Sequence, residues 1–135
     1  MTDFNSAIID EFRTHGGKVG GPFEGAPLLL LTSIGAKSGE ARTTPVMYLP
    51  DGARMVIFAS KAGAPTNPAW YHNLLANPSA TVEVGTSKLE VEASVLTGEE
   101  RDRLYEQQAA LYPRFADYAQ QATREIPVVA LAPKG

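Results

Sequence analysis

The chain has 135 residues, of which 44% are apolar and 20% are charged, and its net charge at pH 7 is −3. These values predict one globular domain over residues 1–135 and argue against nucleic acid as a partner, because a phosphate backbone attracts a basic surface. Because there is no cysteine, disulfides, thiolate metal sites and cysteine nucleophiles are excluded. No segment approaches the roughly 20 apolar residues that span a bilayer, and none resembles a signal peptide, so we expect a cytoplasmic protein.

Residues 1–16 are predicted to form an amphipathic helix. Its apolar residues recur at helical spacing, and the pattern ends at a pair of glycines. The apolar residues are Phe4, Ile8, Ile9 and Phe12. Such a helix either packs on the domain or makes peripheral contact with a membrane surface.

Three strands are predicted at residues 27–33, 42–49 and 54–59. The first two contain the apolar or β-prone runs "PLLLLT" and "TPVMYLP". The second and third are joined by "PDGA", whose Asp-Gly pair is typical of a hairpin turn. The polar segment between the first two strands is therefore expected to be a loop.

A helix is predicted in "NPAWYHNLLANP", with Asn67 as N-cap, Pro68 in the first turn and Asn77-Pro78 as the end. The remaining elements are, in chain order, strands at 80–84 and 88–96, a helix ending near Leu111, a short helix at 112–123 and a strand at 126–133. A capping box of Thr97 and Glu100 marks the start of the helix that ends near Leu111.

The order of these elements predicts the fold class. Six strands with mainly hairpin connections, together with three or four peripheral helices, favour a mainly β (α+β) protein. We expect a six-stranded antiparallel barrel closed by its last strand.

Hydrogen-bond donors are concentrated in the loop "SIGAKSGEARTTP", residues 33–45. The donors are Lys37, Ser38, the Gly39 amide, Arg42, Thr43 and Thr44. Basic residues outnumber acidic ones four to two over residues 32–61, whereas acids outnumber bases seven to three over residues 83–106. Glycine-containing turns rich in donors form concave anion sites. The loop fits neither a P-loop nor a dinucleotide motif, and we expect it to bind a phosphate or carboxylate group.

A second loop, which follows the third predicted strand, repeats this chemistry with Ser60, Lys61, Gly63 and Asn67. On the helix after it, Tyr71, Leu74 and Leu75 share one face, whereas Trp70 and Asn73 share another. If the first face is the buried one, Trp70 and Asn73 face the loops. Alternatively, Trp70 is an anchor of the core.

Three blocks of sequence resemble the deazaflavin (F420)-dependent nitroreductase and quinone reductase family of actinobacterial enzymes. The blocks are "GAKSGEARTTPVMYLPDG", "FASKAGAPTNPAWYHNLLANP", and "YPRFADY" before "IPVVAL". They follow one another in the family's order and spacing, from about Leu28 to Leu131. The resemblance implies a split β-barrel in which reduced coenzyme F420 delivers hydride to a quinone, an activated double bond or a nitroaromatic acceptor.

The matching motifs also imply the coenzyme-binding residues. The phosphate and glutamate tail of the coenzyme would be bound by Ala36, Lys37, Ser38 and Arg42. The chain would then run past the coenzyme through Thr43, Thr44, Pro45, Val46 and Met47. The deazaflavin ring would be bordered by Phe58, Ala59, Ser60 and Lys61. Another part of the coenzyme would be covered by Ala69, Trp70, Tyr71, His72 and Asn73.

Tyr112, Phe115 and Tyr118 match an aromatic trio, often tyrosines, that borders the family's substrate pocket. The chain departs from the family at Phe115, which lacks a hydroxyl, and at Met47, where tyrosine is frequent. A deazaflavin carries hydride itself, so no protein nucleophile and no metal are expected. Hydride transfer leaves negative charge on an acceptor oxygen, which a nearby donor stabilises. We expect Ser60, Tyr112 and Tyr118 to supply such donors.

Two alternatives stay open. The first is a flavin reductase or oxidase that uses FMN on the same barrel. The second is a binding protein that carries a cofactor or apolar ligand without turnover. The expected partner is a small molecule, and the chain is expected to act as a monomer or a homodimer.

Overall fold

The computed structural model describes residues 4–20, 27–60, 66–122 and 124–134. Within them the elements are α1 (Phe4–Thr14), β1 (Leu28–Ile34), β2 (Ala41–Met47), β3 (Leu49–Asp51), β4 (Arg54–Phe58), α2 (Ala69–Ala76), β5 (Ser79–Val84), β6 (Ser87–Leu96), α3 (Gly98–Leu111), α4 (Arg114–Gln121) and β7 (Val128–Pro133). The strands form one sheet in the order β2-β1-β5-β6-β7-β4-β3, and all neighbouring strands are antiparallel.

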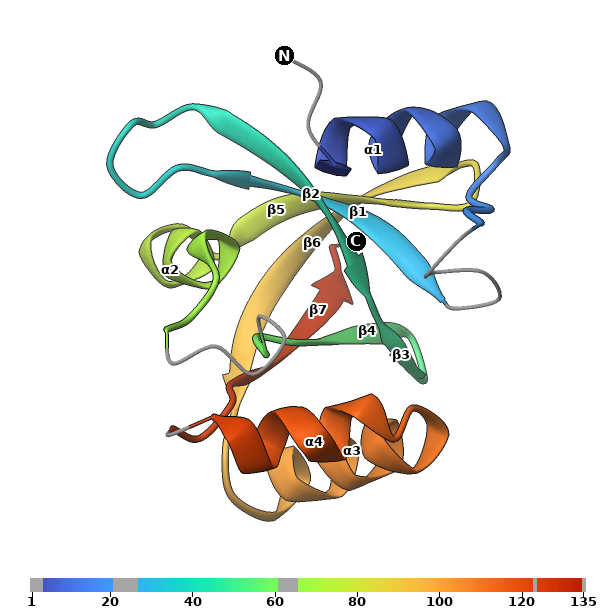
Figure 1. Ribbon diagram of the computed structural model, residues 1–135. Helices are drawn as coiled ribbons and strands as arrows, with labels where there is room; N and C mark the ends of the chain where they lie inside the picture. Colours follow the sequence, from blue (N-terminus) through green and yellow to red (C-terminus); the bar gives the residue numbers. More distant parts are fainter. Residues whose placement is uncertain (1–3, 21–26, 61–65, 123, 135) are drawn as a thin grey trace.

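The sheet is curled so that its two edge strands are consecutive in the chain (Figure 1). Tyr48 alone separates β2 from β3, and its N–H donates to the carbonyl of Pro27 at 3.1 Å. The last strand, β7, pairs with β6 and β4 and joins the two parts of the sheet. The predicted mainly β antiparallel barrel with peripheral helices is therefore confirmed.

The number of strands is corrected from six to seven among the described residues. The predicted strand at 42–49 breaks at Tyr48, because the residues before it pair with β1 and those after it pair with β4. Pro50 has no backbone N–H to donate to a neighbouring strand. It is tolerated in β3 because β3 is an edge strand, which pairs on one side alone. A change of pairing partner leaves no mark in the hydrophobic pattern, which continues across the break.

Two turns have the predicted glycines. α1 ends before Gly16 and Gly17, and Gly17 has a φ of +99°. A Cβ atom at Gly17 would lie 2.7 Å from the Cα of Gly85, so this close approach to the β5–β6 turn requires glycine. The hairpin between β3 and β4 has Gly52 at a φ of +61°, as expected for an Asp-Gly turn.

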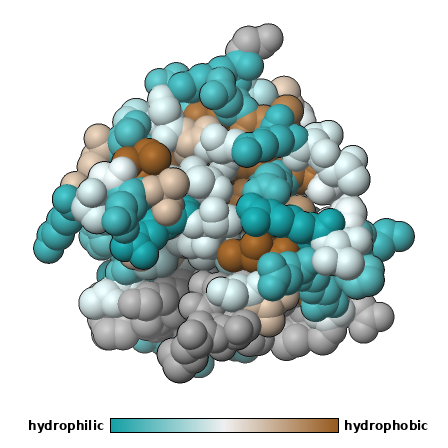
Figure 2. Space-filling view, turned by 90° about the horizontal axis from the view of Figure 1, so that it is seen from above, coloured by the Kyte–Doolittle hydropathy of each residue, from teal (hydrophilic) through white to brown (hydrophobic). Residues whose placement is uncertain are grey.

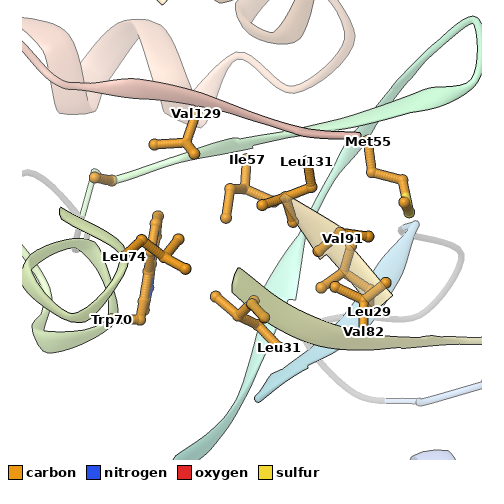
Figure 3. Close-up of a cluster of buried hydrophobic side chains, with 12 residues drawn as sticks. Leu29, Leu31, Met55, Ile57, Trp70, Leu74, Val82, Val91, Val129 and Leu131 are labelled. Carbon is orange, nitrogen blue, oxygen red and sulfur yellow. The ribbon is translucent and has the colours of Figure 1, made fainter. Parts of the chain in front are cut away.

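A first apolar cluster fills the inside of the curled sheet beneath α2. Figure 3 shows Trp70 and Leu74 of α2 directed at strand residues such as Leu31, Ile57 and Val129. The predicted buried face of α2 is partly wrong. Trp70, Asn73 and Leu74 are its buried residues, whereas Leu75 is 54% exposed. The stripe that packs on the sheet therefore consists of Trp70, Asn73 and Leu74, which are spaced i, i+3 and i+4 along the helix.

The helix at the N-terminus covers the sheet at the end opposite α3 and α4 (Figure 1). Ile8 and Phe12 are buried against Leu28 and Leu30 of β1. On the face seen from the α1 side in Figure 2, hydrophilic residues predominate and apolar surface forms small separate patches. The apolar face of α1 therefore packs on the domain, the first of its two predicted alternatives. No helix in the described part of the chain has the length and hydropathy to cross a membrane.

A second cluster lies between the sheet and the α3–α4 pair. Phe115 of α4 meets the rings of Phe58, Tyr105 and Tyr118 edge-on, at centroid distances of 5.3–6.4 Å. The Tyr105 hydroxyl donates to the carbonyl of Phe115 at 2.6 Å, and burial raises the pKa of this tyrosine. The phenol therefore stays protonated and ties α3 to α4.

The predicted helix caps are partly corrected. Thr97 is the N-cap of α3, but its side chain makes no capping hydrogen bond. α2 begins after Pro68 rather than after Asn67, because the Asn67 side chain accepts a hydrogen bond from Arg124 instead. Such a partner, far away in the sequence, cannot be inferred from a capping pattern.

Gln108 is fully buried in α3, and neither polar atom of its side chain has a hydrogen-bond partner among the described residues. Replacing it by methionine, which has a similar length, is expected to raise the free energy of unfolding by about 1–2 kcal/mol, because an unpaired buried polar group costs about 1–3 kcal/mol. Urea denaturation measures the change. The exposed neighbour Gln107, replaced in the same way, is the matched control and should shift stability by less than about 0.5 kcal/mol. A less stable Gln108→Met variant would contradict the expectation.

Candidate functional site

A cleft of about 840 Å³ opens between the β1–β2 loop, the first half of β2 and α2. It is lined by Gly35, Ala36, Lys37, Ser38, Arg42, Thr43, Thr44, Ala69, Trp70, His72 and Asn73. Two segments about 30 residues apart in the sequence thus form one site. All of these residues except Gly35 belong to the set that the sequence resemblance implied.

The β1–β2 loop is shaped by its own hydrogen bonds. The N–H of Gly35 donates to the carbonyl of Glu40 at 2.8 Å, and the N–H of Gly39 donates to the carbonyl of Gly35 at 3.0 Å. The Ser38 hydroxyl accepts from the N–H of Glu40 at 3.1 Å. A Cβ atom at Gly35 would lie 2.5 Å from this hydroxyl oxygen and 3.3 Å from the carbonyl oxygen of Glu40, so a larger residue there would displace the Ser38 side chain. Its position in the donor-rich loop was the signal in the sequence that could have added Gly35 to the predicted site.

Asn73 of α2 anchors this loop to the helix. Its Oδ1 accepts from the N–H of Ala36 at 2.9 Å, and its Nδ2 donates to the hydroxyl of Ser33 at 3.3 Å. Asn73 and Ser33 are 8% and 1% exposed, so water cannot readily replace these bonds. Nearby, the hydroxyls of Thr32 and Thr43 lie 2.8 Å apart across the β1–β2 pair. The cleft therefore has fixed walls on both sides.

The cleft carries positive charge at its rim. Lys37 is exposed, and Arg42 pairs with Glu40 at 3.3 Å. The Arg42 and Glu40 side chains are 62% and 71% exposed, so this pair contributes little to stability. Arg42 can therefore turn toward an anion in the cleft at small cost.

Other residues implied by the resemblance do not line this cleft. On β2, Pro45, Val46 and Met47 are half-buried, and Val46 and Met47 pack against the apolar clusters. At the end of β4, Phe58, Ala59 and Ser60 are buried. Tyr71 is half-buried against the first apolar cluster, and Lys61 lies outside the described residues.

Trp70 is an anchor of the core, and it also borders the cleft. It is 7% exposed within the first apolar cluster. Its indole is thus a rigid wall whose position is set by core packing.

The aromatic trio is distributed over two elements. Tyr112 is the C-cap of α3, whereas Phe115 and Tyr118 lie on α4. Tyr112 and Tyr118 are half-buried, and Phe115 is 5% exposed in the second apolar cluster. The short helix predicted at 112–123 is present as α4, but it begins at Arg114 and does not carry Tyr112, because Tyr112 precedes Pro113 and is extended, with φ −133° and ψ 91°.

Comparison with known proteins identifies the family. The family model described as F420H(2)-dependent quinone reductase matches residues 7–133. An F420H(2)-dependent quinone reductase of Mycobacterium tuberculosis is 39% identical over 127 residues, which cover 89% of this chain and 83% of the relative.

Solved structures give the same result. An F420-H2 dependent reductase is 38% identical with a TM-score of 0.71, and the match covers 78% of this chain and 93% of that one. A structure described as a domain-swapped dimer is also 38% identical, with a TM-score of 0.72 and coverage of 78% and 79%.

The curled antiparallel sheet and these neighbours define a split-barrel reductase. The chain belongs to the F420H(2)-dependent quinone reductase family. The predicted family is thereby confirmed, and with it the prediction of an oxidoreductase that depends on reduced coenzyme F420, as the family's name states.

Proposed function

We propose that this chain transfers hydride from reduced coenzyme F420 to a quinone, and that the cleft binds the anionic tail of the coenzyme. The observation that supports this most is the composition of the cleft. Lys37 and Arg42 lie at its rim, next to the hydroxyls of Ser38, Thr43 and Thr44. A phosphate or carboxylate gains charge-assisted hydrogen bonds from such a set.

The donor set fits the coenzyme on chemical grounds. The tail carries phosphate and glutamate groups, and Glu40 is the sole acid in the segment of residues 33–45. A volume of about 840 Å³ leaves room for a ligand larger than a single ion. We propose that Ala36, Lys37, Ser38 and Arg42 bind the tail, and that Ala69, Trp70, Tyr71, His72 and Asn73 cover an adjoining part.

The coenzyme supplies two-electron hydride chemistry, and the chain supplies orientation and exclusion of water. We propose that the chain from Thr43 through Met47 runs past the coenzyme and that Phe58 through Lys61 border the deazaflavin ring. Ser60, two residues after the end of β4, would then be one of the residues near the deazaflavin ring. Together with Tyr112 and Tyr118 it is a candidate donor to the acceptor oxygen, which gains negative charge during the transfer.

The proposal also specifies the preferred class of hydride acceptor. Phe115 is 5% exposed and packs edge-on against Tyr118 at a centroid distance of 5.3 Å, so the half-buried Tyr112 and Tyr118 are the rings of the trio that an acceptor could reach. A planar quinone needs apolar stacking and one donor near its oxygen. We therefore propose quinones as preferred acceptors, ahead of activated double bonds and nitroaromatics.

The test compares binding and turnover. The protein should bind F420 more tightly than FMN in a direct competition followed by coenzyme fluorescence. In stopped flow, mixing enzyme and reduced F420 with menadione should oxidise the coenzyme at a rate that depends on enzyme concentration. Tighter binding of FMN would assign the chain to flavin chemistry, and F420 binding without oxidation would assign it to a carrier.

We further propose that the enzyme acts in the cytoplasm as a homodimer. A relative of 38% identity is described as a domain-swapped dimer, which supports the dimer. Membrane contact through α1 is not part of this proposal, since Ile8 and Phe12 are buried against β1.

A further inference from the structure

Arg124 lies in the segment between α4 and β7, but its guanidinium binds the connection between β4 and α2. Its Nη1 donates to the side-chain oxygen of Asn67 at 2.6 Å. Its Nη2 is within hydrogen-bond distance of the carbonyls of Ala59, Ser60 and Thr66, at 3.1, 3.3 and 2.9 Å. One planar cation thus contacts four residues 57 to 65 positions away in the sequence.

These four partners form two pairs that flank residues 61–65. Ala59 and Ser60 follow β4, and Thr66 and Asn67 precede α2. The same β4 end is also held by the N–H of Ala59, which donates to the carbonyl of Pro127 at 2.9 Å. Arg124 therefore fixes the point where the chain leaves the sheet relative to the point where it enters the helix.

Both points belong to the proposed coenzyme site. Ser60 is one of the residues proposed to border the deazaflavin ring. α2 begins two residues after Asn67, and four of its residues line the cleft. A shift of its first turn would move Trp70 and also Asn73, which anchors the β1–β2 loop.

We propose that Arg124 is a positioning residue of the coenzyme site, which holds Ser60 and the start of α2 in the geometry that binds F420. This inference rests on the proposed function. The role suits arginine in particular, because its rigid fork can serve several acceptors in one plane, whereas lysine is a single charged point. Charge-assisted bonds of this kind are also stronger than neutral ones.

The experiment measures the Kd of F420 by fluorescence titration for the wild type and three variants. Arg124→Met should raise the Kd about tenfold, and Arg124→Lys, which keeps the charge and loses the fork, should raise it at least threefold. Asn67→Ala removes a single partner and should raise it about twofold to threefold. This milder variant decides the matter if Arg124→Met does not fold.

Arg101→Met is the matched control. Arg101 also binds a backbone carbonyl next to β7, donating from Nε and Nη2 to Ile126 at 3.2 and 2.7 Å. Among the described residues it makes no hydrogen bond or ion pair with the β4–α2 connection, so its loss should lower the melting temperature but leave the Kd within twofold.

A second readout separates positioning from direct contact with the coenzyme. Removing a cation that touches an anionic ligand flattens the dependence of Kd on salt, because that charge pair is no longer screened. Arg124→Met should keep the wild-type salt dependence while binding more weakly. A flattened dependence, an unchanged Kd in folded Arg124→Met or Asn67→Ala, or full binding by Arg124→Lys would overturn the inference. A wild type that does not bind F420 would instead overturn the proposed function.

Discussion

Replacing Lys37 and Arg42 together by alanine is expected to weaken F420 binding at least tenfold. Both side chains line the cleft, and each charge-assisted hydrogen bond to an anion contributes about 1.5–3 kcal/mol, reduced here by exposure to solvent. Loss of about 1.4 kcal/mol already corresponds to a factor of ten in Kd. Fluorescence titration of F420 at 50 mM and 300 mM salt measures the effect, and binding by the wild type should weaken as salt increases.

Two further variants make this test specific. Lys18→Ala removes an exposed cation outside the cleft and should leave Kd unchanged. Glu40→Gln removes the carboxylate that pairs with Arg42 at 3.3 Å and should strengthen binding, because the guanidinium no longer has a competing anion. If the double variant binds F420 as tightly as the wild type, the anion site does not lie in this loop.

Replacing Asn73 by alanine is expected to weaken F420 binding about tenfold and to lower the free energy of unfolding by about 1–3 kcal/mol, the cost of leaving buried polar groups unpaired. The reason is that the N–H of Ala36 and the hydroxyl of Ser33 both lose their partner on α2. Without this anchor, Lys37 is no longer held over the cleft. Coenzyme titration and urea denaturation together measure the two effects.

Asn77→Ala is the control for this variant. Asn77 is the C-cap of α2, and its side chain accepts from the N–H of Ser79 at 3.2 Å in an exposed turn. Its replacement should affect stability slightly and leave coenzyme binding unchanged. Equal Kd values for Asn73→Ala and wild type would show that the loop keeps its position without the asparagine.

Asn73 has one role that the sequence predicted and one that it did not indicate. The resemblance assigned Asn73 to the coenzyme, and this assignment stays a prediction. What the structure adds is its pair of hydrogen bonds to residues 37 and 40 positions away. An asparagine in the middle of a helix gives no local sign of such partners, because its amide can bond to any group that folding brings near.

The difference between local sequence signals and distant contacts also explains the two errors in the predicted helix α2. Asn67 has the chemistry of an N-cap, but Arg124 binds its side chain. Leu75 continues an apolar face by sequence, but the sheet contacts the neighbouring stripe of Trp70 and Leu74. In both cases the local preference amounts to about 1 kcal/mol, and the contacts that override it form only in the folded chain.

The sequence by itself determined the antiparallel barrel, the family, the glycine turns and the donor-rich loop at residues 33–45. Each of these depends on local chemistry, such as strand periodicity, positive φ at glycine, or side-chain donors that are close in the chain. Three features were decided only by the tertiary structure. They are the separate strand β3 after Tyr48, the cleft formed by the β1–β2 loop and α2 together, and the hydrogen bonds of Arg124 to the β4–α2 connection. These features arise where strands change partners or where segments far apart meet, and contacts at such separations are set by the closure of the whole sheet.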